Sequence, residues 1–227
     1  MLLHARVETV QRHGKQLAIC AADGRRLVVQ LGMSGRVGVG NRLPDEPHVH
    51  AWWRVEGDCL VWFQDPRRFG GLTALSNASA LQEHWAQLGP DVVLASPRML
   101  VSAIKSTRRS IKAALLDQQL IAGVGNIYAD EAMHRCQVHP EHPVHEMSLK
   151  SLRLLVGCMR SIMREAIKLG GTTFSDHRTV QGENGGWAHK RRVHGRVGAP
   201  CLTCDRPLHA STVAGRTTVW CVDCQLL

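Results

Sequence analysis

Four cysteines near the end of the chain place the strongest constraint on its fold. They form two pairs, with two residues inside each pair and sixteen residues between the pairs: Cys201, Cys204, Cys221 and Cys224. Each pair can present two thiolates on one tight turn, and two such turns complete a tetrahedral zinc site without an open position. We therefore predict one structural zinc ion. Four free or disulfide-bonded cysteines are the alternative.

The segment between the cysteine pairs is expected to be a small β-hairpin. Two short strand-like runs flank Ala214 and Gly215, which suit a tight turn, and Arg216 lies near its tip. A module of this size buries little apolar surface, so bound zinc would supply much of its folding free energy. An exposed arginine is ordinarily solvated. In a basic chain, contact of Arg216 with a phosphate group is an equally open alternative.

Charge and hydropathy indicate an anionic partner inside the cell. The chain carries 28 Lys and Arg residues against 19 Asp and Glu residues, a net charge of +9. Nucleic acid is the leading candidate for the partner. A membrane surface is set aside, because the sequence has neither an apolar run of about eighteen residues nor a basic amphipathic segment. The opening residues lack the apolar region of a signal peptide, so we expect a cytoplasmic protein, associated with the nucleoid as in bacteria.

The hydrophobic pattern changes along the chain and predicts an α+β fold. Residues 7–75 contain short apolar or alternating runs, which indicate an antiparallel β domain. Residues 97–170 follow a helical period, and residues 170–189 are rich in Gly, Thr, Asp and Asn, which predicts a mobile loop. We place three domains, at 1–95, 96–190 and 191–227.

A glycine turn lies in the middle of the helical part. A helix from residue 111 should run into Gly123 and Gly125, which can turn the chain sharply, and a second helix should start at about Asn126 as its cap. Asp130 and Glu131 fall near its beginning, where acidic groups favour the helix dipole. Free N–H groups at this start would seat a phosphate. An ordinary helical hairpin in a core is the alternative.

Two glycine-bounded loops of the β domain carry bulky side chains. Met33 lies in the Leu-Gly-Met-Ser-Gly run of residues 31–35, and Arg67 and Phe69 lie in the Asp-Pro-Arg-Arg-Phe-Gly run of residues 65–70. Met and Phe usually belong to a core. Displayed on turns beside an arginine, they would instead suit insertion into a base stack, where they hold open the gap of a flipped base.

Taken together, these segments resemble the formamidopyrimidine-DNA glycosylase family, which also includes endonuclease VIII. The resemblance extends from Val10 to Gln225, in order through Gly14-Lys15, the two loops, the 111–129 run, residues 170–173 and the cysteine hairpin. It implies a β-sandwich, a helix–two-turn–helix domain and a zinc finger, in a monomer that binds double-stranded DNA in the cleft between them. The family excises oxidised purines such as 8-oxoguanine and formamidopyrimidines, and then nicks the abasic strand by elimination.

The resemblance also implies roles for single residues. Met33, Arg67 and Phe69 correspond to the residues that fill the vacated stack, and residues 181–190 to a flexible segment that covers the flipped base. Lys15 and Arg216 correspond to catalytic groups that assist elimination, although simple phosphate contact is an open alternative for Lys15. The positions that bind DNA around the lesion are, besides Lys15 and Arg216, His48, Arg67, Arg108, Lys112 and Asn126.

The opening of the chain departs from the family pattern. Family members begin with Pro-Glu after the initiator Met, and the proline amine attacks the sugar C1′; this chain begins Met-Leu-Leu-His. We therefore expect an incomplete sandwich that lacks its first helix and strands. One hypothesis is a glycosylase and lyase whose start has been lost, and a second is an inactive paralogue that binds damaged or abasic DNA without cleaving it. A zinc-stabilised RNA-binding or ribosome-associated protein is the third.

Overall fold

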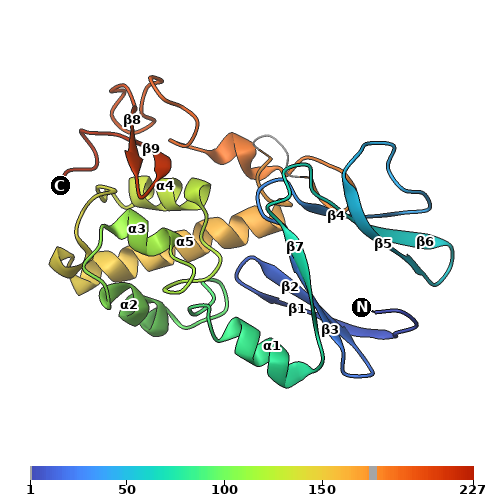
Figure 1. Cartoon of the computed structure of the whole chain (residues 1–227). Coiled ribbons are helices and arrows are strands. Elements are labelled where there is room, and N and C mark those ends of the chain that lie inside the picture. Colours follow the sequence, from blue (N-terminus) through green and yellow to red (C-terminus); the bar gives the residue numbers. More distant parts are fainter. Residues whose placement is uncertain (1, 174–177) are drawn as a thin grey trace. The chain divides into compact units, whose positions relative to one another are not determined.

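The strands expected between residues 7 and 75 form two antiparallel sheets (Figure 1). The computed structural model of the chain describes residues 2–173 and 178–227. The first sheet has the order β1-β2-β3-β7 and the second has the order β4-β6-β5. The strands are β1 (Val7–His13), β2 (Gln16–Ala21), β3 (Arg26–Gln30), β4 (Arg36–Gly40), β5 (Val49–Val55), β6 (Cys59–Gln64) and β7 (Gly71–Leu75).

The alternation of side chains along the strands explains how the first sheet is covered on both faces. Leu27 and Val29 of β3 pack with Phe63 of β6 in one buried cluster between the sheets. Val28, which points the other way, packs with Leu81 of helix α1 (Ala78–Trp85). The predicted antiparallel β-sandwich is therefore confirmed.

The chain divides by its contacts into two units. Unit 1 comprises Met1–Ala86 and Ala166–His189, and unit 2 comprises Gln87–Glu165 and Lys190–Leu227. The helices after α1 are α2 (Pro97–Lys105), α3 (Ile111–Leu116), α4 (Asn126–Arg135) and α5 (Leu149–Lys168), with short 3-10 helices η1 (Val144–Glu146) and η2 (Trp187–Lys190). This grouping joins the cysteine segment to the helices, whereas the predicted boundaries separate them, so the three-domain division stays a prediction.

The helix before the glycine turn ends earlier than predicted. Helix α3 stops at Leu116, because Asp117 leaves the helical conformation and its carboxylate accepts a hydrogen bond from the Gln119 N–H at 2.8 Å. Helix α4 does begin at Asn126, but Gly125 is its N-cap and no side chain caps it. The predicted capping role of Asn126 is therefore wrong, since its amide is used elsewhere.

The last segment forms the predicted hairpin. Strands β8 (His209–Val213) and β9 (Arg216–Trp220) pair antiparallel. Ala214 and Gly215 join them with positive φ angles of 52° and 70°, as a tight two-residue hairpin turn requires. None of the described helices is long and apolar enough to cross a membrane.

The predicted mobile loop lies only partly within the described residues, because positions 174–177 fall outside them. On either side of that gap the backbone is tied together. The N–H of Trp187 donates to the carbonyl of Gly171 at 3.0 Å, and the N–H of Gly186 donates to the carbonyl of Leu169 at 2.7 Å. Trp187 is fully buried. The base-covering role of residues 181–190 remains a prediction.

Candidate nucleic-acid interface

The two loops that carry Met33, Arg67 and Phe69 touch through their backbones. Residues 31–35 connect β3 to β4, and residues 65–70 connect β6 to β7, so both loops cross between the two sheets. Gly32 has a φ of +66°, and a Cβ there would lie 2.6 Å from the backbone N of Gly70. This approach requires glycine at position 32. The loops therefore form one unit, which we call the paired loops.

A buried carboxylate fastens the paired loops to each other. Ser34 Oγ donates to Asp65 Oδ1 at 2.6 Å, and the Gly70 N–H donates to Asp65 Oδ2 at 2.7 Å. The Ser34 hydroxyl oxygen also accepts the N–H of Arg67 at 3.1 Å. Burial by itself raises the pKa of Asp65, but the hydrogen bonds from Ser34 and Gly70 outweigh it, so the pKa lies below its ordinary value.

The paired loops display their large side chains instead of burying them. Met33 is 53% exposed and Phe69 is 54% exposed, which excludes the core alternative for both. The guanidinium of Arg67 lies over the Phe69 ring, 4.8 Å from its centroid. His48 is also exposed. Its carbonyl accepts the Asp65 N–H at 3.1 Å, which places His48 beside the paired loops. The structure thus brings four predicted site residues into one region of unit 1.

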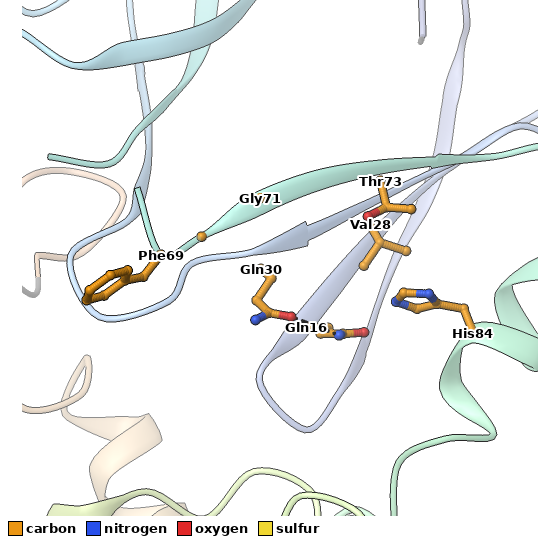
Figure 2. Close-up of a pocket in the computed structure, with 8 residues that line it drawn as sticks. Gln16, Val28, Gln30, Phe69, Gly71, Thr73 and His84 are labelled. Atoms are coloured by element: carbon orange, nitrogen blue, oxygen red, sulfur yellow. Dashed lines mark hydrogen bonds between the residues drawn. The ribbon is translucent and has the colours of Figure 1, made fainter. Parts of the chain in front are cut away.

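A small hollow in unit 1 adjoins Phe69. Figure 2 shows it against the first sheet, with Gln16 of β2 hydrogen-bonded to Gln30 of β3 at 3.1 Å and with His84 of α1 facing them. Its volume is about 170 Å³. Gln16 directly follows Lys15, which is exposed in the turn between β1 and β2. Amide and imidazole groups line the hollow and suit hydrogen bonding to a polar group.

Replacement of Asp65 by asparagine is expected to lower the free energy of unfolding by about 1–3 kcal/mol at neutral pH, because the buried Ser34 hydroxyl and the half-buried Gly70 N–H lose a charged acceptor. The folded pKa lies below the ordinary 3.8, so this contribution is present above the ordinary value and is lost as the pH falls through the folded pKa. Urea unfolding from pH 7 to about pH 3 should show the wild type and the variant converging only at the acidic end.

Asp58→Asn is the matched control, because the Asp58 side chain is 98% exposed and its nearest ion-pair distance, to Arg54, is 3.6 Å. Its replacement should leave the free energy of unfolding unchanged. Equal effects of the two substitutions would show that Asp65 does not fasten the paired loops.

In unit 2, the structure corrects the predicted DNA contact of Lys112. Its side chain is fully buried, and its Nζ lies 2.5 Å from Asp130 Oδ1 and 2.6 Å from Thr218 Oγ1. A third acceptor, the carbonyl of Thr217, lies 3.3 Å away. An ammonium with three acceptors has no donor left for a phosphate. Burial and the nearby Arg216 lower the pKa of Lys112, while Asp130 opposes this shift.

Asn126 and Arg216 are brought together by the hairpin. The Asn126 side-chain amide donates to the carbonyl of Thr217 at 2.8 Å, and Thr217 directly follows the exposed Arg216. The first turn of α4, which starts at Asn126, therefore lies next to the arginine at the start of β9. Arg108 is exposed in the connection between α2 and α3.

The acidic residues of α4 do not act at its N-terminus as predicted. Asp130 and Glu131 lie beyond the first turn and are buried. The Glu131 carboxylate accepts the N–H groups of Arg192, Val193 and His194 at 2.8–3.0 Å. Asp130 Oδ2 lies 2.9 Å from His194 Nδ1. These residues attach the 192–194 segment to α4, a role that sequence reasoning missed because the partners lie more than sixty positions away.

The four cysteine sulfur atoms form a cluster that fits one zinc ion. All lie within 4.8 Å of one another. The distances are 3.4 Å between Cys204 and Cys221 and 4.0 Å between Cys201 and Cys224. Tetrahedral ligation with a Zn–S distance of about 2.3 Å requires sulfur atoms about 3.8 Å apart. The described residues contain no other group of His, Cys, Asp and Glu side chains that could hold a metal.

A histidine of α4 supports this cluster from outside. His134 Nε2 lies 3.3 Å from Cys201 Sγ, and His134 is buried. Burial alone raises the pKa of Cys201, but hydrogen bonds from His134 and from the N–H of Thr203 bring the pKa down to about 6. Such partners of metal ligands orient the ligand and favour its thiolate form.

Comparisons with known proteins agree over almost the whole chain. Residues 1–72 match the formamidopyrimidine-DNA glycosylase N-terminal domain, and residues 88–178 match the H2TH domain of the same enzymes. A formamidopyrimidine-DNA glycosylase of Thermus thermophilus is 40% identical over 226 residues, which cover 97% of this chain and 82% of the relative. One from Geobacillus kaustophilus is 36% identical over 223 residues, 96% of this chain and 81% of the relative.

Solved structures show the same likeness. The MutM (Fpg) protein of Thermus thermophilus superposes with a TM-score of 0.87 at 38% identity, over 97% of this chain and 83% of that chain. The Lactococcus lactis Fpg, in complex with DNA that contains an abasic site, superposes with a TM-score of 0.88 at 29% identity, over 97% of this chain and 82% of that chain.

Proposed function

This chain belongs to the formamidopyrimidine-DNA glycosylase family, and from that membership we propose that it acts in base-excision repair on double-stranded DNA. It recognises an oxidised purine such as 8-oxoguanine or a formamidopyrimidine, excises it, and nicks the abasic strand by elimination. The observation that carries the proposal is the geometry of the paired loops, which hold Met33, Arg67 and Phe69 outward. The close approach at Gly32 and the buried carboxylate of Asp65 keep the backbone of these loops in place.

The paired loops fill the space that a flipped base leaves. Met33 and Phe69 are apolar wedges that enter the stack, and Arg67 lies over the Phe69 ring as a cation beside the bases. A rigid support matters here, because a wedge that swung away would let the base return. His48 is exposed, and its carbonyl accepts the Asp65 N–H. In the proposed complex, its side chain contacts the sugar-phosphate backbone of the DNA strand around the lesion.

Unit 2 holds the phosphates on each side of the lesion. Helix α4 has no side-chain cap, and the positive end of its helix dipole, at Asn126, attracts a phosphate group. Asn126 and Arg216, joined through Thr217, bind beside them, and Arg108 adds a further cation. One zinc ion, held by Cys201, Cys204, Cys221 and Cys224, keeps the arginine hairpin folded.

Lys15 and Arg216 assist the elimination steps, Lys15 from the turn between β1 and β2. The alternative is that the chain binds damaged or abasic DNA without cleaving it. In both cases the protein works as a cytoplasmic, nucleoid-associated monomer.

Binding of DNA duplexes tests the shared part of the proposal. An abasic-site duplex should bind more tightly than an intact duplex of the same sequence. The affinity should fall with salt at a slope of log K against log [salt] between about −3 and −4, because Lys15, Arg67, Arg108 and Arg216 would each neutralise a phosphate at about 0.9 per contact. Equal affinity for the intact and abasic duplexes would contradict lesion recognition and favour a general RNA-binding or ribosome-associated protein.

Borohydride trapping on the abasic duplex separates the two alternatives. The reagent reduces the imine between a protein amine and the sugar C1′, which leaves a covalent adduct that a denaturing gel detects. An adduct above the background of a heat-denatured sample supports the lyase. Tight abasic binding without an adduct supports the protein that binds and does not cleave.

A further inference from the structure

We propose that Lys112 and Thr218 are positioning residues for Arg216, which they hold at a fixed place beside Asn126 through a buried chain of hydrogen bonds. The proposal rests on the function proposed above, in which Arg216 and Asn126 contact DNA. It assigns to Lys112 a role that its burial allows, in place of the direct contact that its burial prevents.

The chain of hydrogen bonds runs from α4 through α3 to the backbone of Arg216. Asp130 Oδ1 binds the Lys112 ammonium at 2.5 Å, and that ammonium donates to Thr218 Oγ1 at 2.6 Å. The Thr218 hydroxyl then donates to the carbonyl of Arg216 at 3.0 Å. Lys112, Asp130 and Thr218 are all buried, so water does not compete for these donors and acceptors.

A second connection fixes the residue between Arg216 and Thr218. The carbonyl of Thr217 accepts from Asn126 Nδ2 at 2.8 Å and from Lys112 Nζ at 3.3 Å. Three consecutive residues of β9 are thereby held by two helices, α3 and α4, which lie beside the hairpin (Figure 1). The side chain of Arg216 leaves this anchored backbone toward solvent.

The contact of Lys112 and Asp130 with β9 is made of charged and polar groups, which indicates that it positions β9 more than it stabilises the fold. A buried ion pair is costly to desolvate, and apolar residues of similar volume often stabilise a protein as well or better. An apolar contact, however, would tolerate sliding of a short hairpin, whereas a lysine that needs one hydroxyl and one carbonyl specifies the register of β9. A displacement of about 1 Å at an arginine that contacts DNA is enough to weaken that contact strongly.

Thr218→Val and Thr218→Ser form the matched pair of variants that tests the proposal. Valine keeps the shape and removes the hydroxyl, and serine keeps the hydroxyl. Thr218→Val should weaken binding of an abasic-site duplex on the order of tenfold and reduce the salt slope by about 1, as expected when one phosphate contact is lost. Thr218→Ser should bind within about twofold of wild type. Bound zinc is quantified in each sample, so that only folded hairpins are compared.

The Arg216→Ala background shows whether the effect passes through Arg216. There, Thr218→Val should weaken binding by less than about twofold, because the group that it positions is already gone. An equal loss in both backgrounds, or wild-type affinity and salt slope for a zinc-loaded Thr218→Val, would overturn the proposal. If Arg216→Ala itself binds as wild type does, it is the proposed DNA contact of Arg216 that fails.

Lys112→Met provides a second, independent variant, with Lys105→Met as its control. Both substitutions remove one lysine charge from unit 2, but Lys105 is exposed on α2. In the zinc-loaded fraction, Lys112→Met should reproduce the loss of affinity seen with Thr218→Val, and Lys105→Met should not. Equal binding by the two lysine variants would count against the positioning role.

Discussion

Removal of the zinc ion is expected to weaken binding of abasic-site DNA strongly and to unfold the cysteine hairpin. The buried core of this segment consists of Val193, Cys201, Leu208, Val219 and Cys221, so two of its five members are themselves predicted zinc ligands. Structural zinc in comparable small modules contributes apparent binding free energies of about 10–16 kcal/mol. A core this small has no comparable source of stability without the metal.

The loss should extend beyond the hairpin. Without an ordered β9, Lys112 loses Thr217 and Thr218 as acceptors, and its buried charge keeps only Asp130 as a partner. Asn126 would also lose its hydrogen bond to the carbonyl of Thr217, the residue that follows Arg216. We therefore expect the affinity for an abasic-site duplex to fall more than about a hundredfold, which is the loss of several kcal/mol of contacts at once.

The experiment treats the protein with a zinc chelator, or replaces Cys221 by serine, and measures bound zinc, thermal unfolding and DNA affinity. Cys59→Ser is the control, because Cys59 lies in β6 and outside the sulfur cluster. This control should keep zinc, melting temperature and affinity. A metal-free protein that still bound the abasic duplex tightly would show that the hairpin does not depend on zinc.

The local features of the fold could be predicted from the sequence. The cysteine spacing, the two-residue turn at Ala214 and Gly215, and the alternation of Leu27, Val28 and Val29 each depend on neighbours in sequence. The glycines of the loops also marked tight turns correctly. Short-range rules of conformation and periodicity are sufficient for features of this kind.

The long-range polar contacts could not be predicted. Lys112 meets Asp130 eighteen positions away and Thr218 a hundred and six positions away, and helical periodicity carries no information on such partners. The family resemblance therefore places Lys112 among the DNA-binding positions, although the fold buries it. The end of α3 differs from the prediction for a local reason, because the Asp117 side chain accepts the N–H of Gln119, two residues further on, and so competes with the helix for a backbone N–H.

Gly32→Ala is expected to have the second large effect, on the paired loops. The new Cβ would lie 2.6 Å from both the Gly70 N and the Phe69 C, and these are backbone atoms that no rotamer change can move aside. The positive φ of +66° adds strain of about 1–2 kcal/mol for a residue with a Cβ, and the overlap adds about 1–3 kcal/mol. Separation of the loops would also pull Ser34 away from Asp65.

Gly57→Ala separates the strain of the positive φ angle from the overlap with backbone atoms. Gly57 has a similar φ of +77°, but a Cβ there would meet nothing within 4 Å. Its replacement should therefore cost only the conformational strain, and the additional loss of unfolding free energy in Gly32→Ala, measured in urea, reports the contact between the loops. Gly32→Ala should also lose most of its preference for the abasic duplex over the intact one, because Met33 and Phe69 depend on that contact for their place. Equal costs and an unchanged preference would mean that the loops hold their wedges independently, and the rigid support proposed for lesion recognition would have to be abandoned.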